Sequence, residues 1–190
     1  IELDESPPRE LNKEALKIAL QIALFFNAKI LSTTQIMRKT VVDGSNTSGF
    51  QRTMLIAKDG YIETKSGKIK IEVICLEEDA ARKIKEDEKS IVFRLDRLGI
   101  PLIEITTSPD IKTPEQTKEV AAKIGEILRA CKVKRGIGTI RQDLNVNIEN
   151  HPRIEIKGFQ DIRSMPETIV KEIERQKTNP SKAGEVRKAN

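Results

Sequence analysis

Three segments of the chain carry hydrophobic residues at helical spacing. In residues 12–29 apolar side chains recur every three or four positions, and Asn12 is a suitable N-cap. A second helix is predicted over 113–132, because a threonine cap is followed by Pro114 at the first helical position. A third is predicted over 166–177. Each has an apolar face that is expected to pack against a sheet or another helix.

Most of the remaining chain alternates polar and apolar residues as strands do. Turns are predicted at the Asp-Gly pair 59–60 and the Ser-Gly pair 66–67, and the charged stretch 79–89 is predicted to form a short helix or a solvated loop. Since strands come in runs without regular βαβ alternation, the predicted class is α+β, a mainly antiparallel sheet with flanking helices. The predicted strands cover 35–42, 50–57, 57–64, 65–77, 90–97, 101–107, 139–148 and 153–159.

Composition narrows the class of protein. With 190 residues the chain favours one domain, and 34 Lys and Arg against 29 Asp and Glu give a net charge of +5, which suits a protein that handles nucleic acid or nucleotide. Two distant cysteines form neither a disulfide framework nor a zinc motif and suggest a reducing cytosol. Without a long apolar run or a signal-like start, the chain is expected to be neither membrane-spanning nor secreted.

Three acidic residues near strands are candidates for one metal site. Glu104 interrupts an apolar run, and an ionised carboxylate in a buried run needs a partner, a metal ion or a proton. Glu78 ends one predicted strand and Asp143 lies within another. Carboxylate oxygens are the ligands that Mg²⁺ prefers, so the three are predicted to act together in phosphoryl transfer.

The strand around Asp143 also carries basic groups. Alternation places Arg141, Asp143 and Asn145 on one face, and the next strand places Glu155 and Lys157 on one face. Such a surface is poor for a core and good for binding a ligand, so Arg141 and Lys157 are candidates for contacts with phosphate. The alternative is that the acidic residues form structural salt bridges, with Arg141 and Lys157 among the partners.

A loop rich in glycine and small polar residues, 43–52, is a candidate for binding phosphate or an amide. Its backbone N–H groups and the side chains of Ser45, Asn46 and Ser48 are suitable donors. An ordinary hairpin loop is the commoner explanation of such a composition. The chain contains neither a P-loop motif nor a dinucleotide-binding fingerprint.

Five motifs, in this order and spacing, resemble the GatB/GatE family of tRNA-dependent amidotransferase subunits, in particular its archaeal members. The resemblance covers about residues 1–175 and implies a cradle-like catalytic fold. It also implies a cytoplasmic enzyme that uses ATP and Mg²⁺ to phosphorylate the glutamyl side chain of Glu-tRNA(Gln), which ammonia then converts to Gln-tRNA(Gln). The motifs are RKTVVDGSNTSGFQRTMLIA, CLEEDAARK, RLDRLGIPLIEITTSPDI, GIGTIRQDLNVNI and RIEIKG.

The resemblance assigns roles to some of these positions. In bacterial relatives the motifs HLEEDAGK, PLIEI and RCDAN supply magnesium ligands, which implies that Glu78, Glu104 and Asp143 are the ligands here. Cys75 stands in place of the histidine that precedes the acidic pair, and Ala81-Arg82 replaces Gly-Lys. The resemblance therefore implies no role for Cys75, Ala81 or Arg82.

The resemblance also implies partners and further domains. Ammonia would come from an asparaginase-like partner, the family's D subunit, and a homodimer within a heterotetramer is the implied assembly. Residues 1–176 would be the catalytic cradle without its N-terminal ligand motif, and 177–190 a flexible basic tail leading to domains that hold tRNA. Such a fragment is expected to be inactive alone. The alternative function is a non-catalytic tRNA-binding or assembly module with the cradle fold.

Overall fold

The chain divides into two compact units in the computed structural model, which describes residues 9–159, 161–179 and 182–189. One unit holds the chain up to residue 61 together with 70–108, and the other holds 62–69 and 109–190. Helices and mainly antiparallel sheets occur in a mixed order, which confirms the predicted α+β class. The expectation of a single catalytic domain stays a prediction beside this division, in which residues 62–69, around the β3–β4 turn, are counted with the second unit.

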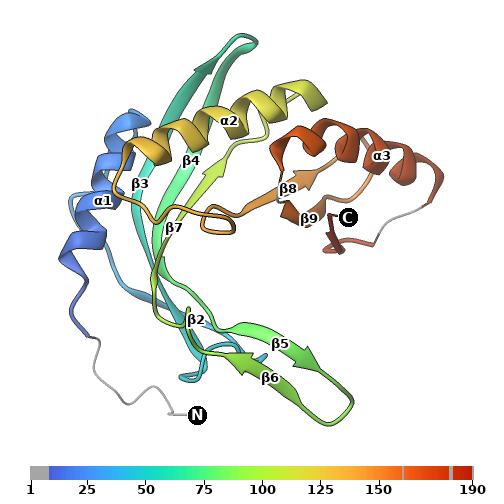
Figure 1. Cartoon of the computed structure of the whole chain (residues 1–190). Coiled ribbons are helices and arrows are strands. Elements are labelled where there is room, and N and C mark those ends of the chain that lie inside the picture. The colour runs from blue at the N-terminus through green and yellow to red at the C-terminus, as the bar shows by residue number, and fades with distance from the viewer. Residues whose placement is uncertain (1–8, 160, 180–181, 190) are drawn as a thin grey trace. The chain divides into compact units, whose positions relative to one another are not determined.

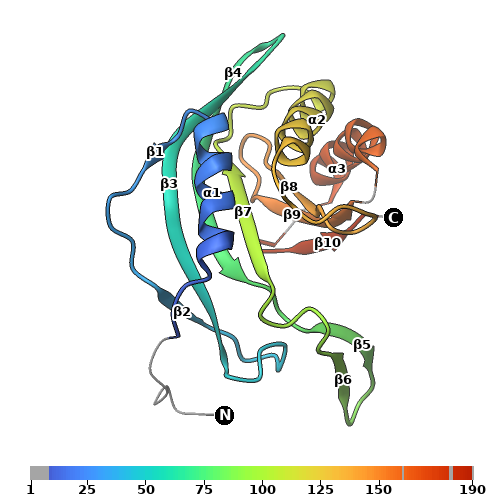
Figure 2. The same cartoon turned by 60° about the vertical axis from the view of Figure 1, so that its left-hand side comes forward.

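Helix α1, Lys13–Phe25, is the helix of the first unit and begins where the sequence predicts. The Asn12 side chain caps it by accepting a hydrogen bond of 2.9 Å from the backbone N–H of Ala15. Ala15 and Ala19 are buried against Met54, Ile56 and Leu76 of the sheet. Figure 2 shows α1 lying along one face of that sheet.

The sheet of the first unit has the order β1-β3-β4-β7, with β2 also paired to β3. The pairs β1–β3, β2–β3 and β4–β7 are antiparallel, and Cys75 of β4 lies opposite Glu104 of β7. A separate two-stranded ribbon, β5 with β6, follows the end of β4. The strands are β1 Lys29–Ile30, β2 Met37–Thr40, β3 Phe50–Thr64, β4 Gly67–Glu78, β5 Arg82–Glu86, β6 Ile91–Arg94 and β7 Pro101–Thr107.

Two local predictions in this unit are wrong. Strand β3 continues through the Asp-Gly pair at 59–60, where the sequence predicts a turn. Tyr61 N–H donates to the Phe26 carbonyl at 2.7 Å, and a side chain at Gly60 would lie 2.7 Å from that oxygen, so this glycine permits a close backbone approach. The charged stretch 79–89 contains strand β5, because β6 supplies a hydrogen-bonding partner.

The second unit packs two helices against a three-stranded sheet of order β10-β9-β8. Helix α2 begins with the predicted Thr113 cap and Pro114, and it packs against α3. Val146, Ile156 and Phe159 of the sheet form its core with Met165 of α3. Figure 1 shows α3 lying over β8 and β9. The elements are α2 Pro114–Ala130, β8 Gln142–Val146, β9 Ile154–Phe159, a 3-10 turn Ile162–Ser164, α3 Met165–Thr178 and β10 Val186–Lys188.

Part of the predicted flexible tail 177–190 is a strand. Strand β10 pairs in parallel with β9, with Arg187 opposite Ile156, and the Ala189 N–H donates to the Lys157 carbonyl at 2.7 Å. The tail lacks apolar periodicity, but backbone hydrogen bonds to a neighbouring strand do not require it. None of the described helices is long and apolar enough to cross a membrane.

Candidate active site

Adjacent strand β3 holds the acidic pair at the end of β4. Thr53 Oγ1 donates to Glu77 Oε1 at 2.7 Å, and Gln51 Nε2 donates to the Glu78 carbonyl at 2.7 Å and to Glu77 Oε2 at 3.4 Å. Arg52 Nε donates to Glu78 Oε1 at 2.8 Å, and its second nitrogen bonds to the same oxygen. Hydrogen bonds from residues 51–53 of β3 thus hold both Glu77 and Glu78 in place.

Glu77 and Glu78 lie on opposite faces of the sheet. Leu76 belongs to the core beneath α1, and Glu78, two residues on, shares that face. Cys75 and Glu77 share the other face. Glu104 lies opposite Cys75 in the register with β7 and therefore points to the same side as Glu77.

The electrostatics of Cys75 agree with that placement. Partial burial, and then the negative charges of Glu104 and Glu77, raise the pKa of the Cys75 thiol to about 11. Both carboxylates therefore lie close enough to Cys75 to oppose formation of a thiolate. A neutral thiol is a weak nucleophile, in keeping with the expectation that Cys75 does not act as one.

This pKa gives a direct prediction for alkylation. In a Cys131→Ser background, Cys75 should react with iodoacetamide at pH 9 roughly 50-fold more slowly than a free cysteine, because far less of it is thiolate. Removing one neighbouring charge with Glu77→Gln should shift the pH profile of alkylation to lower pH. Glu78→Gln, on the other face, is the matched control. Equal shifts in the two variants would contradict the assignment of faces.

Glu104 is exposed, although the sequence predicts a buried run around it. The preceding residue of β7, Ile103, packs against the core beneath α1. Because adjacent residues of a strand point to opposite faces, Glu104 points away from that core. The apolar residues on both sides of Glu104 conceal this alternation in the sequence. Burial therefore does not explain this carboxylate, and its place beside Glu77 is the feature that suggests chemistry.

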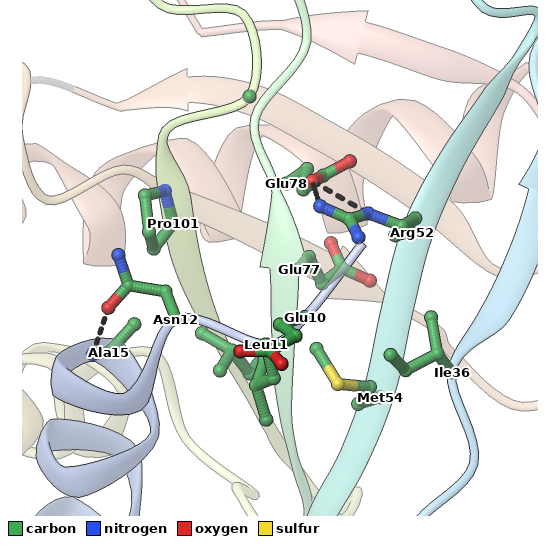
Figure 3. A pocket seen from close by; sticks show the side chains of 12 residues that line it. Glu10, Leu11, Asn12, Ala15, Ile36, Arg52, Met54, Glu77, Glu78 and Pro101 are labelled. Carbon is green, nitrogen blue, oxygen red and sulfur yellow. Dashed lines mark hydrogen bonds and ion pairs between the residues drawn. The ribbon is translucent and has the colours of Figure 1, made fainter. Parts of the chain in front are cut away.

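A cavity of about 220 Å³ lies on the α1 side of the same sheet (Figure 3). Glu77, Glu78 and Arg52 all contribute to its wall, and the ion pair between Arg52 and Glu78 is drawn there together with the capping bond of Asn12. Apolar side chains, among them Met54 and Leu76, form much of the remaining lining. The carboxylate of Glu78 is already bonded to Arg52. Of the pair Glu77 and Glu78, Glu78 is therefore the weaker candidate for a metal ligand.

Asp143 lies in β8 of the second unit and is exposed. Asn145 is opposite Glu155 in the register, and Lys157 Nζ lies 3.7 Å from Asp143 Oδ2 and 3.2 Å from Glu155 Oε1. The structure therefore gathers these four side chains on one face, as alternation predicts for each strand. Arg141 precedes β8 and is also exposed.

Lys157 is positively charged in this cluster. Although partial burial lowers its pKa, the hydrogen bond to Glu155 and the charge of Asp143 together raise the pKa of Lys157 above its ordinary value. The group is thus a permanent cation at physiological pH. Its side chain is 48% exposed, so it remains accessible to an anionic ligand.

The loop 43–49 uses its polar side chains internally. Ser45 Oγ donates to Asp43 Oδ1 at 2.6 Å, and Ser48 Oγ donates to the Phe50 carbonyl at 3.1 Å. Asn46 is 5% exposed. The hydrogen bonds from the Ser45 side chain and backbone lower the pKa of Asp43. This arrangement favours the hairpin-loop explanation of Ser45, Asn46 and Ser48 over a phosphate cradle.

The predicted metal ligands come from both units. Glu78 and Glu104 belong to the first unit and Asp143 to the second. In the part of the chain that the structure describes, no three His, Cys, Asp or Glu side chains gather closely enough to bind a metal ion. Glu77 and Glu104 share a face, and carboxylate oxygens are ligands of the kind that Mg²⁺ prefers.

The choice of Glu78 as a metal ligand stays a prediction, and the structure adds Glu77 as a second candidate in the same acidic pair. The signal that identifies Glu77 is the alternation of β4, in which the buried residues Ile74 and Leu76 assign Glu78 to the core side and Glu77 to the other. That signal is present in the sequence. The register that pairs Glu104 with Cys75 is needed to show which face of the sheet carries Glu104.

Known proteins match both units. The GatB/GatE catalytic domain matches residues 5–189. The E subunit of glutamyl-tRNA(Gln) amidotransferase from Methanothermobacter thermautotrophicus is 57% identical over 176 residues, which cover 93% of this chain and 28% of that protein. The protein of the same name from Pyrococcus horikoshii is 59% identical over 175 residues, covering 92% of this chain and 28% of the relative.

The chain thus spans little more than a quarter of the length of these curated relatives. The family match begins before α1 and extends through β10, so it includes the acidic pair of β4, Glu104 of β7 and the Asp143 cluster. This match agrees with the resemblance found in the sequence motifs. The chain therefore belongs to the GatB/GatE catalytic domain family.

Proposed function

We propose that this chain is the catalytic domain of a glutamyl-tRNA(Gln) amidotransferase, acting in the complete protein with ATP and Mg²⁺. The observation that supports the proposal most strongly is the family match over both units, since the relatives bear that name. The carboxylates Glu77 and Glu104 on one face, and the charged cluster around Asp143, supply residue types that phosphoryl transfer requires.

The proposed reaction has two steps. A carboxylate oxygen of the glutamyl side chain attacks the γ-phosphorus of ATP, and the bond to the bridging oxygen breaks to release ADP. Ammonia then attacks the acyl carbon of the resulting acyl phosphate, phosphate leaves, and the nitrogen loses a proton to give the amide. Ammonia is proposed to come from an asparaginase-like partner protein, within an assembly that contains a homodimer.

The candidate site residues have separate proposed roles in these steps. Glu77 and Glu104 in the first unit, and Asp143 in the second, are each proposed as ligands of Mg²⁺, and the ion would neutralise phosphate charge when bound. Lys157 and Arg141 would orient the phosphate oxygens through their positive charges. Thr53 and Gln51 keep the Glu77 carboxylate in one orientation by donating to its two oxygens.

The decisive experiment is ATP hydrolysis by the full-length protein, with and without its ammonia-producing partner. Hydrolysis should require Mg²⁺ and Glu-tRNA(Gln) together, and Gln-tRNA(Gln) should appear when ammonia is supplied. Binding of tRNA without any ATP hydrolysis would instead favour a non-catalytic tRNA-binding or assembly module.

The place of the metal ion can be tested without activity. A divalent cation at Glu77 and Glu104 would offset the negative charges that raise the Cys75 pKa, so Mg²⁺ should accelerate alkylation of Cys75. The same addition should have no effect on Cys75 in a Glu77→Gln, Glu104→Gln double variant. If Mg²⁺ leaves the alkylation of the unmodified protein unchanged, the ion does not bind on this face.

A further inference from the structure

The β5–β6 ribbon is a two-stranded element that pairs with no other strand in the described part of the chain. It follows directly after the acidic end of β4, and both views show it continuing beyond the main sheet of the first unit (Figures 1 and 2). An isolated two-stranded ribbon is marginally stable in water. Such an element commonly needs a further contact on one of its faces.

One face of the ribbon already has such a contact. Phe93 lies against the loop 43–49, since a Cβ added at Gly44 would be 3.2 Å from its ring. Lys83 lies opposite Phe93 in the register and donates to Glu86 at 2.6 Å. The basic group on this face therefore has an acidic partner.

The opposite face carries an uncompensated pair of cations. Arg82 lies directly opposite Arg94, and both residues are exposed. Lys85 lies opposite the exposed Val92 on the same face, and Asp87 neutralises it at 3.6 Å. Among the described residues, neither the Arg82 nor the Arg94 side chain has a hydrogen bond or an ion pair. Two guanidinium groups thus face solvent side by side.

A second cross-strand pair of cations provides a contrast. Lys29 lies opposite Lys58 at the far edge of the same unit. Asp59 lies near that pair: its pKa is lowered chiefly by its bond to Lys70, and also by the charges of Lys29 and Lys58. Like charges directly opposite each other destabilise a sheet. The lysine pair has a nearby carboxylate that offsets the repulsion, whereas the arginine side chains form no ion pair with a described residue.

We propose that Arg82 and Arg94 bind the phosphodiester backbone of tRNA. Guanidinium groups present a planar fork of donors that matches phosphate oxygens, and two of them at cross-strand distance can contact adjacent phosphates. The ribbon is open to solvent and its neighbouring Val92 is exposed, which suits a long polyanion passing over a surface. The inference rests on the proposed function, which identifies the nucleic acid as tRNA.

The test measures tRNA binding by the full-length protein. The double variant Arg82→Gln, Arg94→Gln should raise the Kd for an unacylated tRNA(Gln) transcript at least about tenfold near 0.1 M salt. It should reduce the slope of log K against log salt by about two. The matched control is Lys29→Gln, Lys58→Gln, which removes the same charge from the other cross-strand pair and should change neither quantity comparably.

Further readouts separate this proposal from others. The melting temperature of the arginine variant should stay level or rise, because repulsion is removed, and amidation should recover at saturating tRNA. An unchanged tRNA Kd in an enzyme that still amidates Glu-tRNA(Gln) overturns the ribbon proposal alone. A raised Kd for ATP, or altered self-association, with unchanged tRNA binding also overturns it. Failure of the unmodified full-length protein to bind tRNA overturns the proposed function itself.

Discussion

Replacing Glu77 with Gln should lower Mg²⁺-dependent phosphorylation of the glutamyl group by at least about 100-fold, while leaving the melting temperature nearly unchanged. The amide keeps the shape of Glu77 and can still accept from Thr53, but it lacks the charge that a hard cation requires. Losing several kcal/mol of charge stabilisation corresponds to two or more orders of magnitude in rate.

Glu78→Gln should show the opposite behaviour. Its carboxylate is bonded to Arg52, and their side chains are 28% and 22% exposed. Removing this partly buried ion pair should cost about 1 kcal/mol of folding free energy, and it should leave the rate within a few fold. Thermal unfolding and Mg²⁺-dependent ATP hydrolysis of the two variants separate the roles. An inactive Glu78→Gln enzyme beside an active Glu77→Gln enzyme would restore Glu78 as the metal ligand.

Replacing Asp143 with Asn in the full-length enzyme should abolish phosphorylation of the glutamyl group with little effect on folding. The ion pair of Asp143 with Lys157 has a separation of 3.7 Å between side chains that are 44% and 48% exposed. Pairs of this kind contribute about 0–1 kcal/mol, far below the cost of breaking a buried pair. A large loss of stability in this variant is therefore not expected.

The matched control for Asp143 is Glu155→Gln. Glu155 bonds to the same Lys157 at 3.2 Å, yet it has no proposed contact with the metal ion. If both variants lose activity equally, loss of a partner for Lys157 is the common cause and Asp143 is not a ligand. If Asp143→Asn remains active, Asp143 has no part in the site. Measurements over a range of Mg²⁺ concentrations distinguish weaker binding of the ion from a slower step.

The sequence alone was sufficient where local chemistry decides the structure. Asn12 and the Thr113-Pro114 pair mark the starts of α1 and α2, because caps act within one helical turn. The turn predicted at Ser66-Gly67 joins β3 to β4, and Gly67, the first residue of β4, has the positive φ of 118° that favours glycine. Alternation also predicted the shared face of Asp143 and Asn145, since neighbouring residues of a strand point to opposite sides.

Tertiary structure decided the features that depend on a neighbouring strand. Whether Glu77 or Glu78 faces Glu104 follows from the packing of Leu76 beneath α1 and from the register of β4 with β7. Strand β5 exists because β6 pairs with it, and β10 because β9 does, although their own residues lack apolar periodicity. Backbone hydrogen bonds between strands are independent of side-chain type, so the amino-acid pattern of one strand does not reveal its partner.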